Sequence, residues 1–258
     1  MPLTILMIGD IVGKLGRRTV ADLLPEIRSS HNVDLVIANG ENAAGGHGLT
    51  PPTAEDLYQA GVDVITSGNH IWSYPEIYPL LESTGPIIRP MNYPDSAPGS
   101  GIHTHNNIAI INLMGRTFMP DQLACPFRAA DEALDSLHGY RNIIVDLHAE
   151  ATSEKVGMAY YLDGRVSAVL GTHTHIPTAD ARILPKGTAF VSDVGMVGGL
   201  HSILGMEIQP IVQRFLTQLP TRFSPVLRGP AVFNSTLVEI DQESGHAISI
   251  QRLDQEVS

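Results

Sequence analysis

The chain has 258 residues, of which 43% are hydrophobic, so it can bury a sizeable core as one large domain or two small ones. Lys and Arg number 16 against 27 Asp and Glu, and the formal net charge is −11. This acidic balance argues against strong non-specific nucleic-acid binding, which needs a basic face. A small phosphate-bearing substrate held by metal ions stays open, because the ions would supply the positive charge.

Short apolar runs rich in Val and Ile recur along the chain and predict strands buried on both faces. They lie at 3–9, 33–38, 62–67, 107–113, 142–147, 166–171 and 188–194. Helical stretches between them are expected at 16–32, 50–61 and 126–139, the second with Thr50 as its N-cap and Gly61 as its stop. This alternation predicts an α/β fold with largely parallel strands.

The end of the chain differs from this alternation. Two strand-like segments flank the turn sequence QESG, which predicts an antiparallel β-hairpin around 231–253. No linker, repeat or low-complexity tract interrupts the sequence, so a single domain over 1–258 is expected.

The sequence predicts a cytoplasmic protein. Cys125 is the only cysteine, which excludes an intrachain disulfide and fits a reducing compartment. The N-terminal MPLTILMIGD is typical of a strand rather than a signal peptide, because it lacks a basic region. No apolar run approaches the roughly 18 residues of a membrane span, so no membrane partner is expected.

Polar residues follow the predicted strands at their carboxyl ends, where ligands bind in α/β sheets. They are Asp10, Glu41, Asn42, Asn69, His70, His148, His173 and His175. Each residue alone is a weak signal, because an Asp after a strand is usually a cap or turn residue. Their recurrence after several strands indicates a shared metal site.

Carboxylate, amide and imidazole side chains without a thiolate suit Fe, Mn or Zn. The set exceeds what one ion needs, so we expect two ions sharing a carboxylate. Such ions lie roughly 3.5–4 Å apart and generate a hydroxide nucleophile near neutral pH.

A second His-Thr-His copy gives an internal comparison. His103 and His105 precede a strand, so in a parallel sheet they would lie at the opposite edge, and no metal role is expected for them. The sequence leaves open whether His47, His201 and the glycine-rich segment 192–202 touch substrate. Within the site, Thr172 and Thr174 either orient imidazoles or only favour the strand, and Asp193 is a further candidate for orienting a ligand histidine.

The motifs Asp10, Glu41-Asn42, Gly68-Asn69-His70, a lone His148 and Gly171–His175 resemble those of the calcineurin-like metallophosphoesterases. That family has D-x-H, GD, GNH[DE], a lone His and GHxH in the same order. Here Val12 stands where the first histidine ligand is found, and Glu41 replaces the bridging Asp. With GDIVG, ANGENAAGG, SGNHIW and SDVGMVGG, these departures make nearly the whole chain similar to the YmdB-like branch.

The resemblance implies an α/β/β/α four-layer sandwich with two mixed β-sheets flanked by helices. It also implies a metal-dependent phosphodiesterase, acting on 2′,3′-cyclic nucleotides with two metal ions, Fe or Mn first and Zn as the alternative. By the same resemblance, Asp10, Asn42 and His175 hold one ion. Asn69, His148 and His173 hold the other, and Glu41 bridges the two. His70 then stabilises the phosphoryl oxygens or acts as the general acid on the leaving oxygen.

Two other interpretations stay open from sequence. The same dinuclear site would also serve a phosphomonoesterase or a nuclease, because the metals recognise phosphate and the loops select the rest. A regulatory, RNA-associated protein with weak catalysis is a different class, against which the filled ligand positions and His70 argue. A barrel amidohydrolase fits poorly, because its His-x-His normally follows the first strand. Metal identity, natural substrate and homo-oligomer formation are not determined by the sequence.

Overall fold

The computed structural model describes residues 2–83 and 85–258. The helices are α1 (Gly13–Ser30), α2 (Pro51–Gln59), α3 (Tyr78–Glu82), α4 (Pro126–Ser136), α5 (Thr152–Leu162) and α6 (Ile208–Thr217). Two 3₁₀ helices, Ile71–Ser73 and Pro75–Ile77, precede α3. No described helix is both long enough and apolar enough to cross a membrane.

The strands form three sheets. A five-stranded sheet has the order β14 (Ala247–Arg252), β13 (Ser235–Ile240), β1 (Leu3–Ile8), β3 (Leu35–Asn39) and β4 (Val64–Thr66). A six-stranded sheet has the order β5 (Ile102–His105), β6 (Ile108–Met114), β7 (Asn142–His148), β8 (Ala168–Thr172), β10 (Ala189–Val191) and β9 (Arg182–Ile183). A four-stranded sheet has the order β15 (Gln255–Val257), β12 (Ala231–Phe233), β11 (Met196–Gly199) and β2 (Asp10–Ile11).

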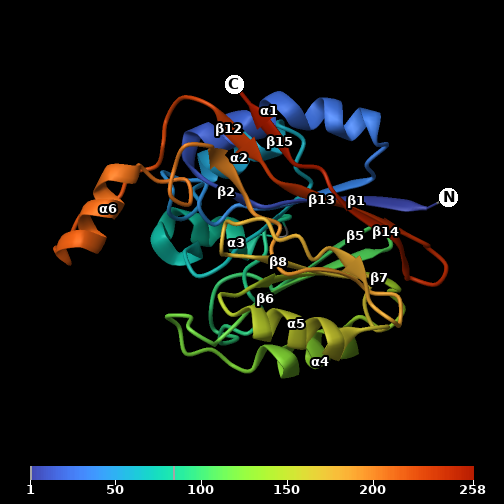
Figure 1. The fold of residues 1–258 in the computed structure, drawn as a ribbon. Coiled ribbons are helices and arrows are strands. Elements are labelled where there is room, and N and C mark those ends of the chain that lie inside the picture. The colour runs from blue at the N-terminus through green and yellow to red at the C-terminus, as the bar shows by residue number, and fades with distance from the viewer. Residues whose placement is uncertain (1, 84) are drawn as a thin grey trace.

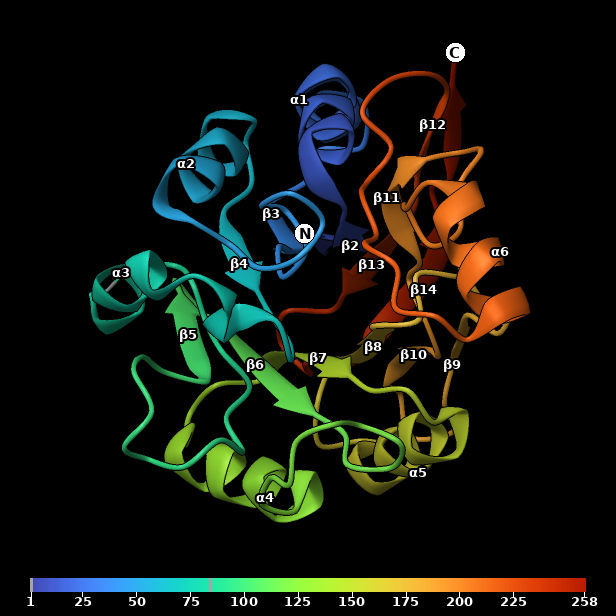
Figure 2. The ribbon, with the colours of Figure 1, turned by 90° about the vertical axis from the view of Figure 1, so that its left-hand side faces the viewer.

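The two larger sheets pack face to face between helices, which is the expected four-layer order (Figure 2). One apolar cluster lies between the sheets and takes residues such as Ile5 and Ile37 from one and Ile110 and Leu170 from the other. Separate clusters join the five-stranded sheet to α1 and α2, and the six-stranded sheet to α4 and α5. Because both faces of each central strand are covered, these strands are uniformly apolar, as their sequences predict.

The four-stranded sheet is an addition to the two sheets that were expected. Its strand β2 follows β1 with only Gly9 between them, and its strand β12 precedes β13 with only Asn234 between them. The chain thus passes from one sheet into the next without a turn, and nothing in the apolar pattern marks the change. The expected C-terminal hairpin segment contains β13 and β14, which pair antiparallel.

Parallel pairing sets the position of the functional residues. In the first sheet β1, β3 and β4 are parallel, and in the second β6, β7, β8 and β10 are parallel. The carboxyl ends of these strands lead into the loops that carry Glu41, Asn69 and His173, and His148 is itself the last residue of β7. Helix α6 stands away from the layered body (Figure 1).

Candidate metal centre

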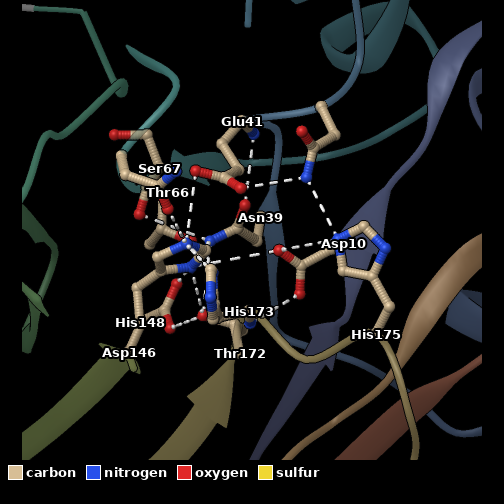
Figure 3. Close-up of polar contacts among 12 residues, drawn as sticks. Asp10, Asn39, Glu41, Thr66, Ser67, Asp146, His148, Thr172, His173 and His175 are labelled. Carbon is tan, nitrogen blue, oxygen red and sulfur yellow. Dashed lines mark hydrogen bonds and ion pairs between the residues drawn. The ribbon is translucent and has the colours of Figure 1, made fainter. Parts of the chain in front are cut away.

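Every residue that the sequence singled out as a ligand lies in one cluster at the carboxyl ends of the strands (Figure 3 shows its core). Two overlapping groups of ligand atoms occur, each within 4.8 Å of one another: Glu41, His148 and His173 in one, and Asp10, Glu41 and His175 in the other. Glu41 belongs to both groups. This sharing is the geometry expected for a carboxylate between two cations, and it places His173 and His175 on different sides of it.

The group of Glu41, His148 and His173 converges on one ring atom of His148. Its Nε2 lies 3.2 Å from Glu41 Oε2, 3.1 Å from Asn69 Oδ1 and 3.1 Å from His173 Nδ1. His148 and Glu41 are almost fully buried, whereas His173 is part-exposed. Oxygen and nitrogen atoms of mixed type so close together match the ligand preferences of Fe, Mn and Zn.

Asn42 connects Glu41 with two histidines. Its Nδ2 donates to Glu41 Oε1 at 2.9 Å and lies 3.1 Å from His175 Nε2, while its Oδ1 lies 2.8 Å from His70 Nδ1. In this orientation the amide nitrogen faces Glu41 and His175, which belong to the group that includes Asp10, and the oxygen faces His70. A half-turn of the carboxamide would exchange them, which is the orientation that a ligand role requires.

Each cluster histidine is fixed through the ring nitrogen that faces away from the cluster. His148 Nδ1 lies 3.0 Å from the Thr172 hydroxyl, His173 Nε2 lies 3.1 Å from Glu150, and His175 Nδ1 lies 3.0 Å from the carbonyl of Leu204. Such partners set the tautomer and the ring orientation of histidines that bind metals. All three imidazoles are therefore held with their other nitrogen available to a cation.

A buried polar network supports the His148 side. The Thr172 hydroxyl donates to Asp146 Oδ1 at 2.7 Å, and Asn39 Nδ2 donates to Asp146 Oδ2 at 3.2 Å. The side-chain oxygen of Asn39 also accepts the backbone N–H of Glu41. The network shows that Thr172 orients an imidazole, one of the two roles left open above.

Three residues of this arrangement were missed from the sequence: Asn39, Asp146 and Glu150. The signal for Asp146 was a carboxylate inside an otherwise apolar strand, because such a group is buried only with partners. Asn39 directly follows a run that was noted only for Glu41 and Asn42. Glu150 lies two residues beyond His148 and carries no distinguishing pattern.

The loop that holds the histidine pair has an unusual backbone. His173 and His175 have positive φ angles of 100° and 65°, a conformation that costs a residue with a side chain free energy and persists only where the surroundings fix it. The His173 N–H donates to Asp10 Oδ2, and the Thr174 N–H donates to Asp193 Oδ2, which also pairs with the buried Lys155 at 2.7 Å. Asp193 therefore fixes the loop backbone, whereas the sequence analysis offered it as a partner of a histidine ring.

The charges of the cluster are strongly coupled. Burial and the neighbouring carboxylates raise the pKa of Asp10 well above its usual value. Burial opposes ionisation of Glu41, but His148 and His70 offset it and hold the pKa of Glu41 well below its usual value. Burial likewise opposes the charge on His148, but Glu41 and Asp10 raise its pKa to about 9. Burial and the charge on His148 lower the pKa of His173 to about 3.

One buried atom of the cluster lacks the partner that a cation would supply. Asp10 Oδ1 is buried and has no hydrogen-bond partner among the described residues. It lies 3.8 Å from His175 Nε2 and 3.9 Å from His148 Nδ1, beyond hydrogen-bond reach. A bare buried carboxylate oxygen is costly, and a metal ion at this point would satisfy it.

The glycine of the Gly-Asn-His motif is needed for space. A Cβ atom at Gly68 would overlap His148 Nε2 and Glu41 Oε2. The motif therefore carries the backbone against His148 and Glu41 before it places Asn69 and His70.

Four other histidines were considered from the sequence, and they differ in how near they lie to this cluster. His103 and His105 lie in β5 at the edge of the six-stranded sheet, and His105 pairs with Ile108 at the amino end of β6, away from the cluster. The His47 ring stacks 4.0 Å from that of His70 and lines the same pocket. His201 is exposed and does not line that pocket.

Comparison with known proteins decides the family. A sequence model described as YmdB-like protein matches residues 6–253. The chain belongs to the YmdB-like family. This confirms the resemblance that the motifs carried.

Relatives of this YmdB-like chain match it over almost their whole length. A 2′,3′-cyclic-nucleotide 2′-phosphodiesterase of Bacillus subtilis (strain 168) is 45% identical over 254 residues, 96% of each chain. A hypothetical protein from Thermus thermophilus has a TM-score of 0.92 at 46% identity, over 98% of this chain and 99% of the other. A novel phosphatase from Mycoplasma pneumoniae has a TM-score of 0.93 at 32% identity, over 99% of this chain and 94% of the other.

Proposed function

We propose that this chain is a metal-dependent phosphodiesterase that hydrolyses 2′,3′-cyclic nucleotides. The observation that carries the proposal is the pair of donor groups that share Glu41. The substrate class follows from the B. subtilis relative, whose name states that activity. Transition-metal ions bound here would activate water and polarise the phosphoryl oxygens.

The residues divide into two sets around the shared carboxylate. Asp10, Asn42 and His175 would hold one ion, and Asn69, His148 and His173 the other, with Glu41 between them. The bare Asp10 oxygen and the three fixed imidazoles support this division. Iron or manganese is proposed, with zinc as the alternative, because the donors are oxygen and imidazole nitrogen.

His70 is proposed as the general acid. Its backbone N–H donates to Glu41 Oε2 at 3.1 Å, and its Nδ1 lies 2.8 Å from Asn42 Oδ1. With the Asn42 carboxamide in the half-turned orientation that a ligand role requires, its Nδ2 donates to His70 Nδ1, so the ring carries a proton on Nε2 for the substrate. The ring lines the pocket and its side chain is 30% exposed, so it can reach a leaving ribose oxygen.

A substrate panel tests the proposal. Metal-replete protein should hydrolyse 2′,3′-cyclic AMP faster than p-nitrophenyl phosphate or single-stranded RNA, and a chelator should abolish the reaction. Preference for the monoester or for RNA would instead identify a phosphomonoesterase or a nuclease. If metal-replete protein hydrolyses none of them, the regulatory interpretation replaces catalysis.

We also propose that the protein is cytoplasmic. The single cysteine, Cys125, excludes an intrachain disulfide, which agrees with the reducing cytoplasm. The charge of −11 disfavours strong non-specific binding to RNA, so RNA is not proposed as a strong non-specific partner.

A further inference from the structure

The pocket over the metal centre has a second wall that the proposed chemistry does not use. Its volume is about 570 Å³, within the range of small-ligand sites. Glu41, His70 and His173 line one side. The pocket is also lined by α6 and its flanking loops, with Met206, Ile211, Arg214, Phe215 and Phe223.

Helix α6 belongs to an excursion of the chain that is closed at its base. The Glu207 N–H donates to the Ser224 carbonyl at 2.9 Å, and Met206 forms a bridge with Pro225. The same stem is linked to the cluster, because the Leu204 carbonyl contacts His175 Nδ1. The wall is therefore fixed relative to the metal ligands, although α6 projects from the body (Figure 1).

The side chains of this wall are apolar and accessible. Phe215 is 71% exposed and Phe223 is 43% exposed, whereas Ile211 anchors the helix and is buried. Two phenyl groups that stay in solvent beside a polar centre need an apolar occupant. A flat ring attached to the phosphoester would fill this place.

Arg214 adds a polar group to the same wall. It is the only Lys or Arg side chain among the described residues that line this pocket. No ion pair is formed by its guanidinium within the described part of the chain. A planar guanidinium beside phenyl rings is suited to stacking on, or donating to, a nucleobase.

We propose that Arg214, Phe215 and Phe223 form the nucleobase subsite of this enzyme. The inference rests on the proposed function and deepens it. The phosphate is held at the metal centre, and the base is held by the α6 wall of the same pocket. These residues determine specificity and take no part in the bond-breaking step.

Steady-state kinetics with two substrates tests the subsite. The substrates are 2′,3′-cyclic AMP and its base-free analogue, 1-O-methylribose 2′,3′-cyclic phosphate. Phe215→Ala should raise KM for the nucleotide roughly 5- to 150-fold, the range of a lost base–aromatic stack, with little change in kcat. It should leave the base-free substrate unchanged, and Arg214→Gln should act in the same direction.

Leu216→Ala is the matched control, since Leu216 is the next residue of α6, is 77% exposed and does not line the pocket. Equal effects of Phe215→Ala on both substrates, or a change in oligomeric state by light scattering, would overturn the subsite in favour of a subunit contact. Unchanged kinetics in an active Phe215→Ala enzyme would also overturn it. A wild-type enzyme that turns over neither substrate would instead refute the proposed function.

Discussion

Thr172→Val tests whether the buried network controls metal binding. The Thr172 hydroxyl is fully buried and donates its one hydrogen bond to Asp146 Oδ1, so it accepts a hydrogen bond from the Nδ1–H of His148. This arrangement leaves His148 Nε2 to face Glu41. Valine has nearly the same shape, so the change removes the hydrogen bonds without opening a large cavity.

The magnitude follows from the groups that lose a partner. Asp146 keeps the Asn39 amide on its other oxygen, but its Oδ1 and His148 Nδ1 lose the hydroxyl. Leaving such buried groups unpaired costs about 1–3 kcal/mol, which corresponds to a melting temperature lower by about 2–12 °C in a chain of this size. Loss of a partner behind a ligand histidine lowers metal affinity about 10- to 100-fold.

Competition with a chromophoric chelator measures the affinity, and calorimetry measures the melting temperature. Thr174→Val is the control, because the contact recorded for Thr174 is its backbone N–H to Asp193, which valine retains. A Thr172→Val protein that binds metal as tightly as the wild type would refute the orienting role of the network.

Three further substitutions, with two control variants, test the assigned roles. His70→Ala should retain both metal ions and lose about 10²- to 10⁴-fold in kcat; loss of an ion on elemental analysis would make His70 a ligand. Glu41→Ala should empty or scramble the site, whereas His103→Ala and His105→Ala should keep the wild-type metal content; a two-metal Glu41→Ala enzyme with normal turnover would contradict the bridge. Asp10→Asn should raise the melting temperature of the chelated protein and lower that of the metal-loaded one, because burial raises the pKa of Asp10, so its charge destabilises the metal-free fold increasingly as pH rises. Shifts of the same sign in both states would show that Asp10 holds no ion.

The sequence predicted the site better than its surroundings. Asp10, Glu41 and His148 follow apolar runs, and parallel pairing brings such strand ends to one edge by geometry alone. Partners across the two sheets depend on how the sheets pack, which local patterns do not encode. Asn39 and Asp146, which lie in different sheets and meet in the core, are an example.

The α6 excursion was also beyond the sequence patterns. Its helix buries Ile211 and leaves Phe215 and Leu216 exposed, so the usual inference from apolar residues to the core fails there. The positive φ angles of His173 and His175 are equally invisible in sequence, because Asp10 and Asp193, far along the chain, hold this backbone.

Anomalous diffraction from crystals of the metal-loaded protein tests the central claim most directly. Two peaks roughly 3.5–4 Å apart are predicted, with Glu41 contacting both and with His173 and His175 on different ions. A single peak, or two peaks of which Glu41 contacts only one, would contradict a dinuclear centre bridged by this carboxylate.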